Sequence, residues 1–260
     1  MTDVVRITVS EATALLTAVF ERAGASASVA SCVSRALVAA ESEGQIGHGF
    51  SRVADYVAQI RSGKINVDAK PILERRAPAA LHVKAGHGFA YPALDVALQA
   101  GIPFAREMGV AVTTVGNSHH CGALSIQVER IAEAGLLGVM VANAPKAIAP
   151  WGAKDAVFGT NPIAFATPVA KAPPLVIDLS LSIVARGKVM AAHKAGKSIP
   201  EGWALDRAGR STTDAASALE GSMLPIGEAK GTALALMVEI LAAALSGTAF
   251  SRDAGSFFPA

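Results

Sequence analysis

The sequence is poor in cysteine, in aromatic residues and in charge. Cys32 and Cys121 are its two cysteines among 260 residues and lie far apart, which gives no sign of a disulfide framework and favours a reducing compartment. Charged residues make up 17% of the chain and aromatic residues 5%, and the net charge of +2 comes without a basic cluster. A nucleic-acid partner therefore has no electrostatic support.

Long hydrophobic runs are also missing. The most apolar stretch, residues 232–247, is interrupted by Glu239 and is too short to cross a bilayer. The first residues lack the basic and hydrophobic regions of a secretory signal. Because 52% of the residues are hydrophobic, we expect a globular chain with a large core, in the cytoplasm and without a membrane partner.

Hydrophobic periodicity predicts helices followed by a mixture of strands and helices. The expected helices cover residues 10–24, 28–41, 51–63, 92–108, 124–135, 183–195 and 230–246. The expected strands lie within residues 80–86, 109–116, 136–144, 157–168 and 174–182, and residues 196–226 read as irregular. This order predicts an α/β fold, with a helical subdomain over residues 1–75 packed beside a sheet domain over residues 76–260.

One expected motif of nucleotide-binding proteins is absent. No G-x-G-x-x-G sequence follows a strand where the Rossmann fold requires it. An ordinary dinucleotide-binding fold is therefore not supported.

The segment EGQIGHGFSRV (43–53) frames His48 between two glycines. An imidazole on such a loop can give or take a proton near neutral pH. Arg52 follows four residues later, and its guanidinium can hold a carboxylate at two points. A helix end with a surface histidine and arginine remains the alternative interpretation.

The segment GNSHHCGALS (116–125) carries the adjacent His119 and His120 between a strand and a helix. Backbone N–H groups at such a helix start can hold a phosphate. Adjacent residues of a strand point to opposite faces, so the pair does not favour a shared metal ion unless the chain turns sharply. We expect no metal site, and one histidine that faces a ligand.

Further polar residues stand where predicted strands and helices begin or end. Thr160 offers a hydroxyl near an Asn-Pro turn, and Asp178 ends an apolar strand. Lys188 lies on the first turns of a predicted helix, and Lys230 comes before the last helix, where it can meet a phosphate. Turn and capping roles remain open for these residues.

Six ordered blocks resemble the malate/L-lactate dehydrogenase family of the non-Rossmann type. They are SHHCGAL, APWG, FGTNPIAFATP, VIDLSLSIVARGKV, PEGWALDRAGRSTTD and LPIGEAKGTALALMVEIL. The resemblance implies a homodimer, a mixed and mostly antiparallel sheet domain of its own type, and NADPH or NADH as the cofactor. The amino-acid sequences of the blocks are most similar to those of the branch that reduces Δ1-pyrroline-2-carboxylate or Δ1-piperideine-2-carboxylate.

The resemblance also implies roles for individual residues. His48 resembles a proton donor, Arg52 the residue that holds the substrate carboxylate, and His120 an acid/base candidate of the hydroxy-acid relatives. Thr160 resembles a substrate contact, and Lys188 is a further substrate-binding candidate inside a matching block. The residues that resemble cofactor contacts are His120, Cys121, Gly122, Ala123, Leu124, Asp178, Leu179, Ser180, Ala229 and Lys230.

Two features depart from the family pattern. Family members commonly carry serine immediately before the loop histidine, whereas this chain has Gly47 and so lacks a hydroxyl able to relay a proton. Family chains also continue beyond the SFF block near residue 256, and this sequence ends at Ala260. The segment that follows in relatives contributes to the sheet domain and to nucleotide contacts, so we expect weaker cofactor binding or stability without it.

The sequence predicts an NAD(P)H-dependent oxidoreductase that reduces a cyclic imine 2-carboxylate to L-proline or L-pipecolate, in proline metabolism. The first alternative is a dehydrogenase of a 2-hydroxy acid such as malate, lactate or ureidoglycolate, because those substrates also present a carboxylate beside a reducible carbon. The second alternative is an inactive relative that only binds ligands. Gly47 and the end of the sequence at Ala260 favour this alternative.

Overall fold

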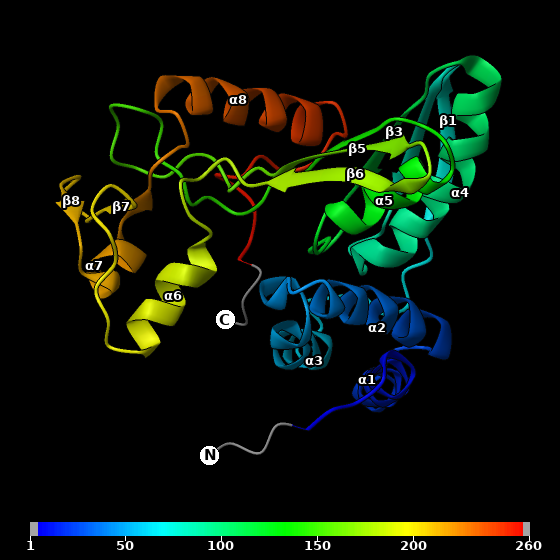
Figure 1. Cartoon of the computed structure of the whole chain (residues 1–260), viewed down its shortest axis with the longest axis horizontal. Helices are drawn as coiled ribbons and strands as arrows, with labels where there is room; N and C mark the ends of the chain where they lie inside the picture. Colours follow the sequence, from blue (N-terminus) through cyan, green and yellow to red (C-terminus); the bar gives the residue numbers. More distant parts are fainter. Residues whose placement is uncertain (1–4, 257–260) are drawn as a thin grey trace. The chain divides into compact units, whose positions relative to one another are not determined.

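The computed structural model describes residues 5–256 of the chain (Figure 1). These residues form two compact units, which we call unit 1 (residues 5–127) and unit 2 (residues 128–256). The sequence analysis placed the domain boundary after residue 75. In the structure, the first three-stranded sheet belongs to the same unit as the N-terminal helices.

Unit 1 begins with helices and continues with a small sheet. Its elements are α1 (Val9–Ala23), α2 (Ala27–Ser42), the 3₁₀ turns η1 (Ile46–His48) and η2 (Phe50–Arg52), α3 (Val53–Arg61), β1 (Ile72–Ala77), β2 (Ala80–Lys84), α4 (Ala90–Met108) and β3 (Val112–Gly116). The helix α5 (Ser125–Glu133) contains the boundary between the units. The helices predicted for this part of the chain are confirmed, and β1 was not predicted.

A capping residue determines where α1 begins, and a shared apolar core packs α1, α2 and α3 together. Thr8 caps α1, and its side chain and that of Glu11 bond each other's backbone N–H groups in a capping box. Phe20 of α1 and Leu37 of α2 are completely buried and pack with Tyr56 of α3. The apolar face of each helix therefore faces the same core.

The sheet of unit 1 has the order β1-β2-β3. The strands β1 and β2 pair antiparallel, and β2 pairs parallel with β3, with α4 as the connection that packs against both. Figure 1 shows α4 running along this sheet. The parallel pair brings the carboxyl ends of β2 and β3 to one edge, which is where α/β sheets commonly bind ligands.

Unit 2 combines a second sheet with helices and short strands. Its elements are β4 (Gly138–Val141), β5 (Ile163–Val169), β6 (Ala172–Leu179), α6 (Arg186–Lys194), β7 (Ala204–Leu205), β8 (Ser211–Thr212), α7 (Ala215–Glu220), β9 (Ser222–Met223), α8 (Ala229–Glu239) and the π-helical turn η3 (Ile240–Ala244). Residues 196–226, expected to be irregular, hold three short strands and a helix, because strands of two residues leave no periodic signal.

Antiparallel pairing dominates unit 2. The sheet β4-β5-β6 is antiparallel throughout, as is the small sheet β8-β7-β9. Ile148 and Leu181 lie at the centre of the core, where Ala235 and Val238 of α8 join them. A mixed α/β fold with mostly antiparallel sheets is thereby confirmed.

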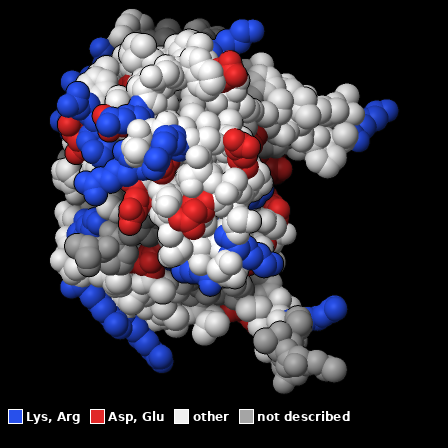
Figure 2. All heavy atoms as spheres, turned by 90° about the vertical axis from the view of Figure 1, so that its left-hand side faces the viewer, with Lys and Arg blue, Asp and Glu red and all other residues white. Residues whose placement is uncertain are grey.

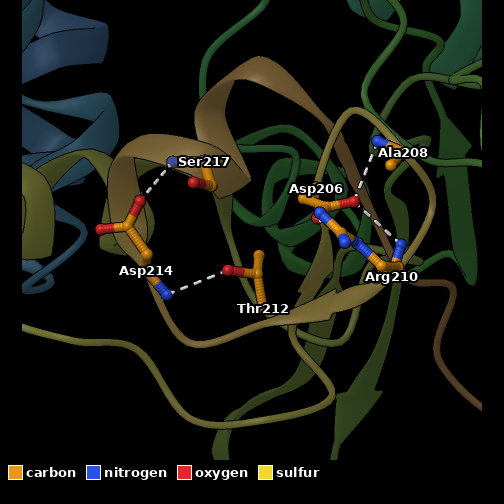
Figure 3. Close-up of polar contacts among 6 residues, drawn as sticks. All are labelled: Asp206, Ala208, Arg210, Thr212, Asp214 and Ser217. Atoms are coloured by element: carbon orange, nitrogen blue, oxygen red, sulfur yellow. Dashed lines mark hydrogen bonds and ion pairs between the residues drawn. The ribbon is translucent and has the colours of Figure 1, made fainter.

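A hairpin carries the chain from β7 to β8 and into α7 (Figure 3). Asp206 accepts hydrogen bonds from the backbone N–H groups of Ala208 and Arg210, each at 2.9 Å, and pairs with the Arg210 guanidinium. The bond from the Arg210 N–H is the main reason that the pKa of Asp206 is lowered. Asp214 then caps α7 by accepting from the Ser217 N–H at 2.8 Å.

Charge is mixed on the face of the molecule that Figure 2 shows. Lys and Arg side chains are densest at the upper left of this view and are otherwise scattered, with Asp and Glu side chains among them and uncharged areas between. Among residues 5–256, no helix combines the length and the apolar character that crossing a bilayer requires.

Candidate active site

The double-histidine segment lies at the carboxyl end of the parallel pair β2–β3. β3 ends at Gly116, and the chain then turns at Asn117, which has a positive φ of 53°. The Asn117 carbonyl accepts from the His87 N–H at 2.7 Å, and the Gly88 carbonyl accepts from the His119 N–H at 2.9 Å. The segment is thus held against the loop that follows β2.

The turn changes the directions of the two rings. The rings of His119 and His120 both meet Tyr56 edge-on, with centroid distances of 5.9 Å and 6.2 Å. The sharp turn that the sequence left open is present, because residues 117–124 have left the strand, so the rule of opposite faces does not apply to this pair.

The loop that carries His48 is fixed by polar contacts on both sides. The Glu41 carboxylate accepts from the Phe50 N–H at 2.7 Å, and Gly49 passes so close that a Cβ there would collide with the Glu41 side chain. The Gln45 side chain donates to the Ser125 hydroxyl at 2.7 Å. The loop is therefore held to α2 and to the start of α5.

His48 and His120 are brought together, although 71 residues separate them in the sequence. Their imidazole rings stack with a centroid distance of 5.4 Å and an interplanar angle of 9°. Arg52 lies on the same loop, and its Nε donates to the Gly47 carbonyl at 2.7 Å. His48, Arg52 and His120 are each partly buried.

Two tyrosines lie behind the histidine pair. The hydroxyl of Tyr56 is 2.7 Å from Nδ1 of His120 and 3.1 Å from the hydroxyl of Tyr91. Both tyrosines are buried, with 1% and 3% of their surface exposed. Sequence reasoning missed them, although Tyr56 of α3 follows Arg52 by four residues, the spacing of one helical turn.

Burial sets the protonation state of the histidines. It is the main reason that the pKa of His120 lies well below its ordinary value, and the nearby charge of Arg52 lowers that pKa further. Burial, Lys64 and Arg52 lower the pKa of His119 to about 4. Both rings are therefore neutral at neutral pH, and each keeps one nitrogen lone pair.

Gly122 has two reasons to be glycine. Its φ of +71° is left-handed, and a Cβ at this position would lie 2.6 Å from the Tyr91 hydroxyl. The buried Ala123 and Leu124 follow it and lead into α5, while Cys121 keeps partial exposure. The expected cofactor-binding segment, residues 120–124, thus passes over a buried phenol.

The remaining candidate residues belong to unit 2. The carbonyl of Thr160 accepts from the Leu181 N–H at 2.8 Å, and the carbonyl of Leu181 accepts from the Ile226 N–H at 2.8 Å. Thr160 therefore lies beside the end of β6, where Asp178, Leu179 and Ser180 stand, and near the start of α8. Lys188 lies on α6 and is exposed.

A buried polar network holds the turn that follows Thr160. Asn161, with a positive φ of 40°, donates to the Glu239 carboxylate and to the Ala235 carbonyl, each at 3.0 Å. The Ser251 N–H donates to Glu239 at 3.1 Å, and the Ser251 hydroxyl also bonds this carboxylate. The turn is thereby attached to α8.

The start of α8 suits a phosphate of a nicotinamide nucleotide. Gly227 and Glu228 both have positive φ, and the exposed Ala229 and Lys230 open the helix. N–H groups of a first helical turn and a lysine together attract phosphate. Among residues 5–256, no group of three or more His, Cys, Asp or Glu side chains is arranged to hold a metal ion.

The chain matches the family model of malate/L-lactate dehydrogenase over residues 7–260. It is 51% identical over 252 residues to a (2R)-3-sulfolactate dehydrogenase (NADP(+)) from Chromohalobacter salexigens, covering 97% of this chain and 75% of that one. It is 43% identical over 251 residues to a Δ1-pyrroline-2-carboxylate/Δ1-piperideine-2-carboxylate reductase from Pseudomonas putida, covering 96% and 74%.

A solved structure resembles the fold closely. The Δ1-piperideine-2-carboxylate reductase from Pseudomonas syringae pvar. tomato superposes with a TM-score of 0.94 at 37% identity, covering 97% of this chain and 76% of that one. The predicted class of NAD(P)-dependent oxidoreductase agrees with the dehydrogenases and reductases among these relatives. The predicted family is confirmed, and this chain belongs to the malate/L-lactate dehydrogenase family.

Proposed function

We propose that the chain catalyses NADP(H)-dependent oxidation and reduction at a carbon that bears a carboxylate, with a 2-hydroxy acid and its 2-oxo acid as the substrate pair. The stacked pair His48 and His120 beside Arg52 carries this proposal. The identity of 51% to a sulfolactate dehydrogenase favours the hydroxy acid, and the NADP(+) in that protein's name favours the phosphorylated cofactor.

Arg52 binds the substrate carboxylate. The bond from its Nε to the Gly47 carbonyl fixes the guanidinium plane, so the side chain is oriented before substrate arrives. A carboxylate held there also offsets the positive charge that lowers the pKa of His120. Binding of substrate therefore raises the basicity of the imidazole at the moment when it is needed.

His120 accepts the proton of the substrate hydroxyl in the oxidation and returns it in the reduction. A bound nicotinamide nucleotide supplies or accepts the hydride. Residues 120–124, Asp178, Leu179, Ser180, Ala229 and Lys230 are the proposed cofactor contacts. His48 stacks on His120 and is the proposed proton donor when the substrate is an imine. Thr160 and Lys188 are proposed substrate contacts.

A cyclic imine carboxylate is the second candidate substrate. It is favoured by the 43% identity to an imine reductase and by the TM-score of 0.94 to another. His48 then protonates the developing amine. A Cβ at Gly47 meets nothing within 4 Å, so the serine expected from the family would fit and its absence is a chemical difference.

A substrate panel tests the proposal. Oxidation of (2R)-3-sulfolactate, L-lactate and malate with NADP+ is compared with reduction of Δ1-pyrroline-2-carboxylate and Δ1-piperideine-2-carboxylate with NADPH. We expect kcat/KM for one hydroxy acid to exceed that for the imines by at least about tenfold. The reverse ranking supports the imine. Absence of turnover with every substrate, together with NADPH binding by calorimetry, supports the inactive relative instead.

We also propose a homodimer. The outer face of the sheet β4-β5-β6 carries a row of exposed apolar side chains, namely Val139, Leu175, Ile177 and Leu179. Apolar patches of this kind commonly mark an interface. Sedimentation velocity should give twice the mass of the chain, and a monomer at all concentrations tested contradicts the proposal.

A further inference from the structure

We propose that Glu41 is a positioning residue for the reaction: its carboxylate holds the loop that carries His48 and Arg52 against α2. The effect on turnover rests on the proposed function, whereas the attachment of the loop does not. Glu41 lies in the last turn of α2, and its Oε2 accepts from the Phe50 N–H at 2.7 Å. That N–H comes two residues after His48 and two before Arg52, so one bond fixes the backbone between the two side chains.

The direction of this bond is unambiguous, because a backbone N–H donates and a carboxylate oxygen accepts. Phe50 opens η2, which runs directly into α3, so its N–H belongs to the first turn, where donors lack partners inside a helix. Gly49 precedes η2 and has no side chain with which to cap it. Glu41 therefore supplies from another helix the charge-assisted bond that a capping residue supplies locally.

The position of Glu41 is unfavourable for α2 itself. The carboxyl end of a helix carries a partial negative charge, so a carboxylate in the last turn is repelled there. Residues 39–42 are Ala, Ala, Glu and Ser, so no basic side chain of that turn offsets the charge. Residues that break a local rule of helix formation are expected at functional sites. The bond to Phe50 is the compensating role that the structure shows for this carboxylate.

The fit between Glu41 and Gly49 is close. A Cβ at Gly49 would lie 2.9 Å from the Cβ of Glu41 and 3.0 Å from its Cα, and would overlap its carboxylate. Because the Cα belongs to the backbone of α2, an added methyl group has to push the loop away from the helix. Gly47 of the same loop differs, since a Cβ there meets nothing within 4 Å. The loop is therefore pressed against α2 at Gly49 and open at Gly47.

Hydrogen bonds carry this attachment to both functional side chains. The His48 N–H donates to the Gln45 carbonyl at 2.8 Å, and the Arg52 N–H donates to the Gly49 carbonyl at 3.0 Å. The turns η1 and η2 meet at Gly49, which ends the first and precedes the second. A shift of Gly49 away from Glu41 therefore displaces both turns. The imidazole of His48 and the guanidinium of Arg52 move with them.

Kinetics with the best substrate of the panel test the positioning. Glu41→Ala removes the acceptor, and we expect kcat/KM to fall about 10- to 100-fold, because a misplacement of about 1 Å can cost this much. KM should rise at least about threefold, since Arg52 holds the substrate carboxylate. A merely structural role of Glu41 would reduce the fraction of active enzyme, which lowers the apparent kcat and leaves KM unchanged.

Glu41→Gln is the conservative variant. Its amide oxygen can still accept from the Phe50 N–H, so kcat/KM should stay within about fivefold of the wild-type value. A loss as large as that of Glu41→Ala would contradict a role through this bond. Glu21→Ala is the matched control, because Glu21 is an exposed carboxylate in the last turn of α1 in the same unit. It should change neither kcat nor KM.

Hydrogen exchange tests the attachment without any substrate. Deuterium uptake of peptides that cover residues 43–52 should rise in Glu41→Ala, while uptake of peptides from α1 stays at the wild-type level. Gly49→Ala should give the same rise and the same increase in KM, because its methyl group displaces the same carboxylate. It provides the readout if Glu41→Ala fails to fold, as judged by circular dichroism.

The outcomes separate this inference from the proposed function. Wild-type kcat/KM in a folded Glu41→Ala protein, or a lowered kcat with unchanged KM, overturns the positioning role. Unchanged deuterium uptake over residues 43–52 overturns the attachment itself. Faster exchange there in Glu41→Ala, in a chain without turnover on any substrate, upholds the attachment and overturns the proposed function, and with it the role in turnover.

Discussion

Both units of the molecule bury polar side chains, but the two sets differ in kind. In unit 1 the buried groups around His120 are phenols and imidazoles, each of which can donate or accept a hydrogen bond. In unit 2 the network of Asn161, Glu239 and Ser251 has fixed directions, because amide and backbone N–H groups donate to a carboxylate that only accepts.

This difference indicates that the two clusters have different roles, one in proton transfer and one in holding the backbone. A hydrogen-bonded chain that can reverse its direction suits proton transfer. A network whose directions are fixed has one arrangement only, so it holds the backbone. Changes in unit 1 should therefore alter activity more than stability, and changes in the network of unit 2 should do the opposite.

The largest effect is expected for Arg52→Ala. Loss of the charged two-point contact to a carboxylate should reduce kcat/KM about 100- to 1,000-fold, chiefly through KM, because the contact exists before and during the reaction. Steady-state kinetics with the best substrate of the panel provide the measurement.

Arg35→Ala is the matched control for this variant. Arg35 lies in the same unit, 3.8 Å from Asp95, with 60% of its side chain exposed. It should leave KM unchanged. A normal KM in Arg52→Ala would remove Arg52 from the binding site.

The next effect concerns Glu239→Ala in unit 2. The change removes the acceptor of Asn161 and Ser251 while both remain buried, which should lower the free energy of unfolding by about 3 kcal/mol. Urea denaturation measures the loss, and hydrogen exchange of peptides from residues 128–256 should reveal it locally. Glu220→Ala, at an exposed position of the same unit, should cost little. Equal stability of the two variants would show that the network does not hold unit 2.

The smallest effect is on the pH dependence of stability. The folded-state pKa values of His119 and His120 lie below the ordinary 6.5. At a pH between the folded-state pKa and 6.5, the unfolded chain therefore binds more protons than the folded chain. The stabilisation is complete above pH 6.5 and is lost as pH falls toward about 4. For His119 we expect a loss of about 2 kcal/mol at pH 5, and for His120 a loss in the same direction.

Urea denaturation at pH 7 and pH 5 measures this dependence. Most carboxylates remain ionised over that interval, so histidines dominate the difference. His119→Leu keeps an apolar group against Tyr56 and should show a smaller loss on acidification. Equal slopes for the variant and the wild type would contradict the assignment.

The helices were predictable from the sequence because their apolar residues repeat with the helical period. α1, α2 and α4 lie within two residues of their expected bounds. β1 was missed because its residues are almost all exposed and carry charges, so no alternation marks the strand. β7, β8 and β9 are each two residues long and depend on partners far away in the sequence.

The site was predictable in part. The glycine-framed His48 and the histidine pair are local signals, and the family resemblance connected them. The buried Tyr56 and Tyr91 carry no local signal, since each reads as one more apolar residue of an amphipathic helix. The network of Asn161 and Glu239 joins residues 78 positions apart, and only the folded chain brings them together.

The tyrosines and tryptophans are also divided between the units. Both tyrosines lie in the hydrogen-bonded chain of unit 1, and both tryptophans, Trp151 and Trp203, lie in unit 2. Emission excited at the red edge, where only indole absorbs, therefore reports on unit 2 alone. Because burial raises the pKa of both phenols, tyrosinate absorbance at alkaline pH appears only as unit 1 opens. The chain thus carries two built-in optical probes, one for each half, and needs no added label.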